Sequence, residues 1–168
     1  SEQFGDNICV PQNEDSNMMP NSPYAVAKMG AFYITKIYRK YGLKTYNSLA
    51  FNHESPLRPD TFVTKKIIKA LVAISKGSST PLVLGNINSN RDWGYAPEYV
   101  DAMIKIINSD IPDDYVICTS ETHSIREFIE ESCNQLGMTL KWEGERLDEV
   151  GYIDNKPLIF ISKDFYRP

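Results

Sequence analysis

The stretch Ser-Pro-Tyr-Ala-Val-Ala-Lys at residues 22–28 is the most informative part of this chain. Ser22 is a preferred N-cap residue and Pro23 suits the first helical position, so the stretch predicts a helix start. Tyr24 and Lys28 are four residues apart and therefore share one face of that helix. A lysine cation beside a phenol favours the phenolate, which makes Tyr24 a candidate base. Taken alone, the pair also fits an ordinary Tyr and a solvated Lys.

Apolar periodicity on either side of this stretch predicts alternating helices and strands. Helices are expected from residue 23 to 41, at 65–76, from 97 to 107 and from 124 to 137, and strands at 46–51, 82–84, 115–118, 140–142 and 158–161. The apolar stripe of the first helix is Ala25, Met29, Phe32, Ile37 and Tyr41. Ser124 and Glu127 form a capping-box pattern. Such alternation is typical of an α/β fold.

Composition excludes several classes of protein. A hydrophobic content of 42% over 168 residues suits a buried core rather than a disordered chain. The net charge of −4 argues against a nucleic-acid partner. No apolar run approaches the roughly 20 residues that span a bilayer, so no membrane partner is expected. Three cysteines without a Cys-x-x-Cys pair and two histidines predict no metal site and suit reduced thiols in the cytoplasm.

Further motifs follow in a fixed order along the chain. They are Ser-Glu-Gln-Phe-Gly at 1–5, Phe-Asn-His-Glu-Ser-Pro at 51–56, Thr-Phe-Val-Thr-Lys-Lys at 61–66, Arg-Asp-Trp-Gly at 91–94, Thr-His-Ser-Ile-Arg-Glu-Phe at 122–128 and Tyr-Arg-Pro at 166–168. Together with the Tyr-Lys pair, they resemble the GDP-mannose 4,6-dehydratases of the extended short-chain dehydrogenase/reductase superfamily. The run at 52–56 separates this family from dTDP-glucose dehydratases and sugar-nucleotide epimerases.

The resemblance implies the rear part of a Rossmann-like doubly wound domain, interleaved with a smaller mixed α/β substrate-binding domain. Residues 1–58 would form the C-terminal half of an NADP-binding domain. Residues 59–168 would be mainly substrate-binding, with about 91–109 returning to the cofactor domain. The sequence has no G-x-G-x-x-G run, which family members carry near their start to hold the dinucleotide phosphates. We therefore expect an internal piece that is inactive alone and lacks the family's final helices.

The resemblance also implies the reaction and its catalytic residues. GDP-mannose would become GDP-4-keto-6-deoxy-mannose by oxidation at C4, loss of water across C5 and C6, and reduction at C6. Tyr24 would take the C4 hydroxyl proton, and Lys28 would hold the nicotinamide ribose of NADP. Glu2, which lies 22 residues before Tyr24, would remove the C5 proton and protonate the leaving C6 hydroxyl. As a lone acidic residue, Glu2 would also fit a solvated surface position.

Binding residues follow from the same resemblance. His53 and Arg58, like Tyr24 and Lys28, match cofactor-binding positions. Four residues match contacts to the nucleotide diphosphate, namely Asn52, Lys66, Arg91 and Arg167. Arginine suits bidentate phosphate contacts, while the alternative for each cation is a surface charge or, for Arg91, a salt bridge with its neighbour Asp92.

A homo-oligomer, either a dimer or a tetramer, is expected for the complete protein. The family has Pro-Arg-Arg-Gly on a loop that reaches a neighbouring subunit, where this chain has Pro-Leu-Arg-Pro at 56–59. The loop has thus lost one cation and gained a stiff proline in place of a flexible glycine.

Two other functions remain open from the sequence. The first is another extended short-chain enzyme that acts on a nucleotide sugar, such as an epimerase or a reductase. Epimerases need no acid at the position of Glu2, so this residue separates the two interpretations. The second is a non-catalytic remnant that binds a sugar nucleotide without binding the cofactor.

Overall fold

A computed structural model describes residues 1–5 and 10–166 of the chain. Its fold is mixed α/β with parallel strand pairs, which confirms the predicted fold class. The chain divides into two compact units, each built from two segments. Unit 1 is Ser1–Ser55 with Asp92–Glu121, and unit 2 is Pro56–Arg91 with Thr122–Pro168. The returning segment of unit 1 therefore extends beyond residue 109. The cofactor and substrate roles given to the two portions stay predictions.

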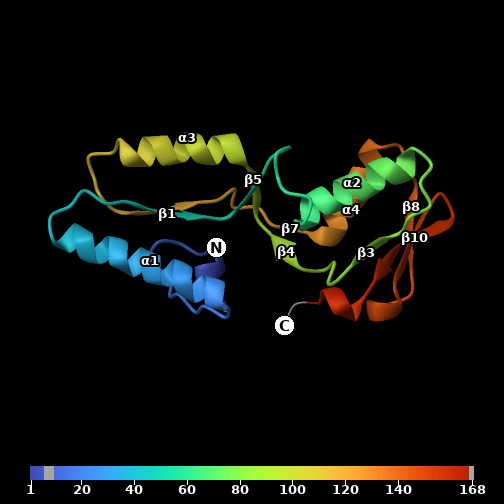
Figure 1. The fold of residues 1–168 in the computed structure, drawn as a ribbon, viewed down its shortest axis with the longest axis horizontal. Helices are drawn as coiled ribbons and strands as arrows, with labels where there is room; N and C mark the ends of the chain where they lie inside the picture. Colours follow the sequence, from blue (N-terminus) through green and yellow to red (C-terminus); the bar gives the residue numbers. More distant parts are fainter. Residues whose placement is uncertain (6–9, 167–168) are drawn as a thin grey trace. The chain divides into compact units, whose positions relative to one another are not determined.

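Unit 1 is built on two short parallel strand pairs. Strands β1 (Asn47–Ala50) and β6 (Asp114–Ile117) form one pair, and β2 (Asn52–Glu54) and β5 (Trp93–Tyr95) form the other. Helices α1 (Pro23–Lys40) and α3 (Ala96–Ile107) lie on opposite sides of the β1–β6 pair (Figure 1). Helices on both faces are what a parallel sheet requires, because neither face can be left to water.

Helix α1 begins as predicted. The Ser22 hydroxyl accepts a hydrogen bond from the Ala25 amide at 3.1 Å, and Pro23 is the first helical residue. The predicted apolar stripe is correct near this end, because Ala25 and Phe32 are buried. It is wrong further along, where Ile37 is 48% exposed and Tyr41 is 78% exposed, since no described part of the unit covers them.

A buried carboxylate ties α1 to the β1–β6 pair. Asp114 is 7% exposed and accepts hydrogen bonds from Arg39 Nη2 and Asn47 Nδ2, each at 2.8 Å. Lys36 Nζ lies 3.0 Å from its other oxygen. Burial raises the pKa of Asp114, but the hydrogen bonds from these three side chains outweigh burial, so the pKa lies below its ordinary value.

We expect Asp114→Asn to lower the free energy of unfolding by about 2 kcal/mol at pH 7, between the values for exposed and fully buried ion pairs. A carboxyl with a lowered pKa in the folded state stabilises above its unfolded pKa of about 4, and this contribution disappears as pH falls through the folded value. Urea unfolding at pH 7 and pH 3 should therefore show a difference between wild type and variant that shrinks in acid.

Asp113→Asn is the matched control, because the Asp113 side chain is 63% exposed and meets Arg39 at 3.4 Å. Its expected cost is below about 0.5 kcal/mol. An equal cost for the two variants, or a difference that persists at pH 3, would contradict the role of the buried carboxylate.

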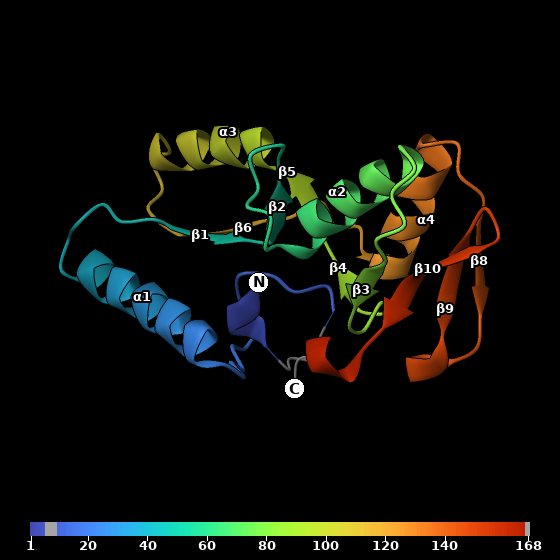
Figure 2. The ribbon, with the colours of Figure 1, turned by 45° about the vertical axis from the view of Figure 1, so that its right-hand side comes forward.

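Unit 2 consists of a four-stranded sheet covered by two helices (Figure 2). The strand order is β3-β10-β9-β8, with β10 parallel to β3 and antiparallel to β9. The bounds are β3 Leu82–Leu84, β8 Leu140–Glu143, β9 Val150–Ile153, β10 Lys156–Ile161, α2 Val63–Ser75 and α4 Ile125–Gln135. One apolar cluster joins helices and sheet, with Ile67, Leu71, Ile129, Leu82 and Ile159 among its members.

Short elements complete the two units. Strands β4 (Asn90–Arg91) and β7 (His123–Ser124) form an antiparallel pair in unit 2, and the capping box of α4 is present as predicted. Single 3₁₀ turns are η1 Glu2–Phe4, η2 Arg146–Asp148 and η3 Lys163–Phe165. Within residues 1–5 and 10–166, no helix combines the length and apolar character needed to cross a membrane.

Candidate functional site

Tyr24 and Lys28 lie in the first half of α1, where their spacing gives both side chains the same helix face. Tyr24 is 62% exposed, and Lys28 is also exposed. Neither side chain contributes to the apolar core of unit 1. A phenol and an ammonium group that are both exposed on one helix face are available to a bound molecule.

Glu2 lies on the 3₁₀ turn η1, which packs against α1. The anchor of this turn is Phe4, which is 1% exposed and forms a cluster with Phe32 of α1 and Leu49 of β1. Glu2 itself is exposed, so packing holds the turn while leaving the carboxylate in water. The sequence analysis predicts neither the turn η1 nor the packing of Phe4 that holds it.

Ser1, the residue before the turn η1, is tied to strand β1. Its backbone nitrogen donates a hydrogen bond to the Ala50 carbonyl at 2.8 Å, at the last residue of β1. Glu2, the next residue, therefore lies near the carboxyl end of a parallel strand. Ligands of open α/β sheets bind at such ends.

His53 and Asn52 follow β1 on strand β2. Asn52 is half-buried and pairs with Trp93 of β5. His53 Nδ1 lies 2.8 Å from the Phe51 carbonyl oxygen, and its ring stacks on Tyr99 at a centroid distance of 4.9 Å. Unit 1 thus holds Glu2, Tyr24, Lys28, Asn52 and His53 on η1, α1 and β2.

Asp92 is a buried polar residue for which the sequence indicates no site role. It is 5% exposed, and its carboxylate accepts hydrogen bonds from the Thr119 hydroxyl at 2.8 Å and the Ser120 amide at 3.0 Å. The Thr119 amide contacts both carboxylate oxygens at 3.1 Å. Asp92 therefore holds the turn after β6. Its carboxylate bonds to Thr119 and Ser120 instead of forming the salt bridge with Arg91 that the sequence left open.

Three of the predicted cations lie in unit 2, in different surroundings. Arg91 is exposed on β4, and its Nη1 donates to the Asn90 carbonyl at 2.7 Å. Lys66 is half-buried on α2, where burial lowers the pKa of its ammonium group. Its Nζ donates to the Val83 carbonyl at 2.6 Å and lies 4.2 Å from the centre of the Phe165 ring.

Arg58 lies in the loop after β2, and its Cζ is 3.7 Å from the centre of the Phe62 ring. Arg167, the fourth predicted cation, lies outside the described residues. Lys66 has structural partners already, whereas the Arg91 guanidinium meets no carboxylate among the described ion pairs. Of these two residues, Arg91 is therefore the better disposed to receive an anion.

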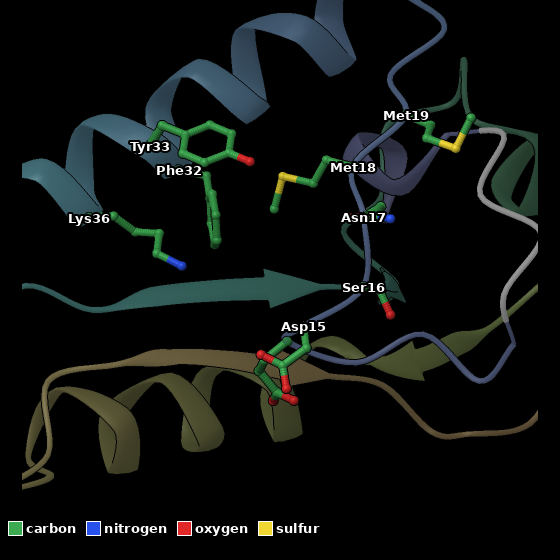
Figure 3. A pocket seen from close by; sticks show the side chains of 9 residues that line it. Asp15, Ser16, Asn17, Met18, Met19, Phe32, Tyr33 and Lys36 are labelled. Atoms are coloured by element: carbon green, nitrogen blue, oxygen red, sulfur yellow. The ribbon is translucent and has the colours of Figure 1, made fainter.

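A cavity of about 510 Å³ lies elsewhere in unit 1, between α1 and the loop at residues 14–19 (Figure 3). Met18 points from the loop towards Phe32 of α1, and both belong to the apolar cluster of Phe4. Lys36, which also lines the cavity, is the partner of Asp114. None of the predicted site residues lines this cavity, so the candidate site is a different place.

The chemistry of the two groups of residues differs. Unit 1 offers a phenol, an ammonium group, a carboxylate and an imidazole, which together suit proton transfer and binding of hydroxyl groups. Unit 2 offers guanidinium and ammonium groups, which suit an anionic ligand. Among the described residues, no cluster of His, Cys, Asp and Glu could hold a metal ion.

Comparison with known proteins agrees with these features. A family model described as GDP-mannose 4,6 dehydratase matches residues 1–168. GDP-mannose 4,6 dehydratase from Dictyostelium discoideum is 44% identical over all of this chain, and the human protein of that name is 41% identical. The alignments cover 48% and 46% of these relatives, so the chain spans about half of their length.

Solved structures with low sequence identity share the fold. RMD from Pseudomonas aeruginosa complexed with NADPH has a TM-score of 0.78 at 20% identity, over 96% of this chain and 51% of that one. The dTDP-glucose 4,6-dehydratase from Bacillus anthracis in complex with NAD has a TM-score of 0.72 at 21% identity, over 82% of this chain and 44% of that one. With the family match over its whole length, the chain belongs to the GDP-mannose 4,6-dehydratase family.

Proposed function

We propose that this chain supplies the catalytic residues of a GDP-mannose 4,6-dehydratase. The observation that carries the proposal is the carboxylate of Glu2 on a turn that packs against the helix of Tyr24 and Lys28. An epimerase needs the Tyr-Lys pair but no such acid. The relatives at 41–45% identity that bear the dehydratase name support the same interpretation.

We propose NADP as the cofactor. Tyr24, Lys28 and His53 provide a phenol, an ammonium group and an imidazole in unit 1, a donor set that fits the nicotinamide and ribose end of a dinucleotide. The NADPH in the RMD structure supports this choice. When bound, its nicotinamide would supply a hydride acceptor for sugar C4 and a hydride donor for C6. The 168 residues include no Gly-rich turn for the pyrophosphate.

The proposed proton transfers use two residues of unit 1. Tyr24 Oη takes the proton of the C4 hydroxyl, and Lys28 stabilises the phenolate that must exist before this step. The C4 ketone then acidifies the C5 proton, because the resulting carbanion is delocalised as an enolate. The Glu2 carboxylate removes that proton and delivers it to the C6 hydroxyl, which leaves as water.

Product analysis with the full-length protein that contains this sequence tests the function. With NADP and GDP-mannose, a dehydratase yields a sugar nucleotide with a C4 ketone and without the C6 hydroxyl, lighter by one water. An epimerase yields an isomer of unchanged mass. Binding of GDP-mannose without any product would identify a non-catalytic remnant. Either of these last two outcomes would contradict the proposal.

We further propose that unit 1 belongs to the cofactor domain and unit 2 to the substrate-binding domain. The parallel pair β1–β6 with a helix on each side supports the first assignment. The sheet of unit 2 is largely antiparallel, as expected for a separate substrate portion. Homo-oligomer formation and a cytoplasmic location stay predictions.

The 168-residue chain alone is expected to bind NADP with a Kd above about 0.1 mM, which corresponds to less than about 5.5 kcal/mol of binding free energy. The reason is that it holds residues for one end of the cofactor and no Gly-rich turn for the charged middle. Titration calorimetry of the chain with NADP measures this. A micromolar Kd for the chain would show that other residues bind the diphosphate.

Arg91→Ala in the full-length protein is expected to weaken GDP binding about ten- to a hundredfold, as for loss of a charge-assisted contact worth about 1.5–3 kcal/mol. It should raise KM more than it lowers kcat, and Arg91→Lys should recover only part of the loss. Because Arg91 is exposed, the melting temperature should not change. A lowered melting temperature with unchanged GDP affinity would make Arg91 a structural residue.

A further inference from the structure

The His53 ring is held from two sides within unit 1. Its Nδ1 lies 2.8 Å from the Phe51 carbonyl oxygen, and its face meets the Tyr99 ring at 4.9 Å between centroids and 30° between planes. Tyr99 comes from α3, whereas His53 and Phe51 belong to the chain around β2. Phe51 is thus a neighbour of His53 in the chain, whereas Tyr99 lies beside it because of the fold.

The position of Tyr99 is itself tightly defined. Tyr99 is 3% exposed and is the buried residue of α3. Its Cε2 would lie 2.1 Å from a Cβ atom placed on Gly94, so the ring occupies the space that a side chain there would need. Gly94 pairs with His53 in the β2–β5 register. The absence of a side chain at Gly94 therefore lets the Tyr99 ring reach the histidine.

The contact to Phe51 decides which nitrogen of His53 carries the proton. A carbonyl oxygen only accepts hydrogen bonds, so Nδ1 must be the donor. In the neutral ring Nε2 then has no proton and is an acceptor. Such a nitrogen pairs with a hydroxyl or an amide N–H of a ligand, and it does not pair with a phosphate oxygen.

The Tyr99 hydroxyl gives a way to separate the ring from its polar group. Burial raises the pKa of Tyr99 to about 12, with smaller contributions from Asp92 and Cys118, so the phenol is neutral near pH 7. Its oxygen is buried and has no hydrogen-bond partner among the described side chains and backbone. Phenylalanine would keep the stacking face and remove an unsatisfied hydroxyl.

We propose that Tyr99 is a positioning residue for His53, whose ring it holds against the Phe51 carbonyl, so that Nδ1 carries the proton and Nε2 accepts a hydrogen bond from the bound cofactor. The part that concerns the cofactor rests on the proposed function, in which His53 contacts NADP. The part that concerns the tautomer depends only on the contacts of unit 1.

Nitrogen-15 NMR of the 168-residue chain tests the tautomer without any cofactor. The sequence has two histidines, and exposed His123 serves as the internal reference. We expect His53 to show a protonated Nδ1 and an unprotonated Nε2 at a pH where both rings are neutral, whereas His123 should average both tautomers. A protonated Nε2 on His53 would overturn the proposal.

Variants of Tyr99 then test the positioning. Tyr99→Phe should keep the His53 signals of the wild type, and Tyr99→Leu should shift them towards the averaged values of His123. If Tyr99→Leu does not fold, Tyr99→Met replaces it, because the flexible Met side chain fills irregular space but has no flat face. Unchanged His53 signals in a folded Leu or Met variant would show that Tyr99 does not hold the ring.

Cofactor affinity of the full-length protein provides the second readout. We expect Tyr99→Leu and His53→Ala each to weaken NADP binding about two- to tenfold, as for one lost hydrogen bond. The double variant should be no weaker than His53→Ala, because Tyr99 acts through the histidine. If the losses of NADP affinity in the two single variants add in the double variant, Tyr99 does not act through His53. The NMR result together with unchanged affinity in His53→Ala would refute only the cofactor contact.

Discussion

Tyr24→Phe in the full-length protein is expected to lower the rate of C4 oxidation about 10²–10⁴-fold, the usual contribution of a positioned general base. Phenylalanine keeps the ring and the helix but has no oxygen to take the C4 hydroxyl proton. The fold should be unaffected, because Tyr24 is 62% exposed and lies outside the apolar core. The loss should therefore appear in kcat at unchanged melting temperature.

A single-turnover experiment measures this step through the ultraviolet absorbance of reduced nicotinamide. Tyr33→Phe is the matched control, since Tyr33 lies on the same helix and is 50% exposed. It should oxidise GDP-mannose at the wild-type rate. Oxidation at the wild-type rate in Tyr24→Phe would show that another group takes the proton.

Glu2→Gln is expected to have a different consequence from Tyr24→Phe. Glutamine has nearly the same shape but cannot take a proton from C5, so elimination should slow about 10²–10⁴-fold while C4 oxidation continues. Reduced nicotinamide should then accumulate during a single turnover. The two variants thus assign oxidation to Tyr24 and elimination to Glu2. A measurement of overall activity could not separate these steps, because both variants would lose it.

Deuterium exchange into the sugar at C5 measures the step that Glu2 is proposed to perform. Glu2→Gln should lose this exchange, and Glu2→Asp should retain part of it because the carboxylate is kept on a shorter side chain. Wild-type exchange in Glu2→Gln would mean that a different base acts at C5.

Local signals explain which parts of the fold were predictable. Helix starts at Pro23 and Ile125 follow from Ser caps, whose hydrogen bonds depend on neighbouring residues only. The longer strands followed from short apolar runs. The whole-chain family resemblance rests on seven motifs, and the fold class derived from it is confirmed.

The features that were missed depend on distant partners. Strands β2, β4, β5 and β7 have two or three residues each, too few for a periodic pattern, and β9 was missed as well. The exposure of Ile37 could not be predicted, because a stripe shows which face is apolar and not whether anything covers it.

In the candidate site too, features set by neighbouring residues were predictable from the sequence, and features set by distant residues were not. The Tyr24–Lys28 pair is a local helix pattern, and the structure keeps it on one face. Asp92 and Tyr99 act through contacts with Thr119 and His53, which are more than 25 residues away in the chain. For these two contacts, the sequence offers only the motif Arg-Asp-Trp-Gly at 91–94, which contains Asp92 and Gly94.

We propose that this chain carries the groups that remove a proton from C5 and a hydroxyl from C6 of the sugar. Conversion of GDP-mannose by the full-length protein in heavy water tests it, with NMR of the product at early times. The isolated product, kept in heavy water without protein, controls for spontaneous exchange beside the ketone. We predict a product with a C6 methyl group whose signal is not split by C5, because C5 has taken deuterium from solvent. A product that keeps its original C5 proton, or an isomer that keeps the C6 hydroxyl, would contradict the claim.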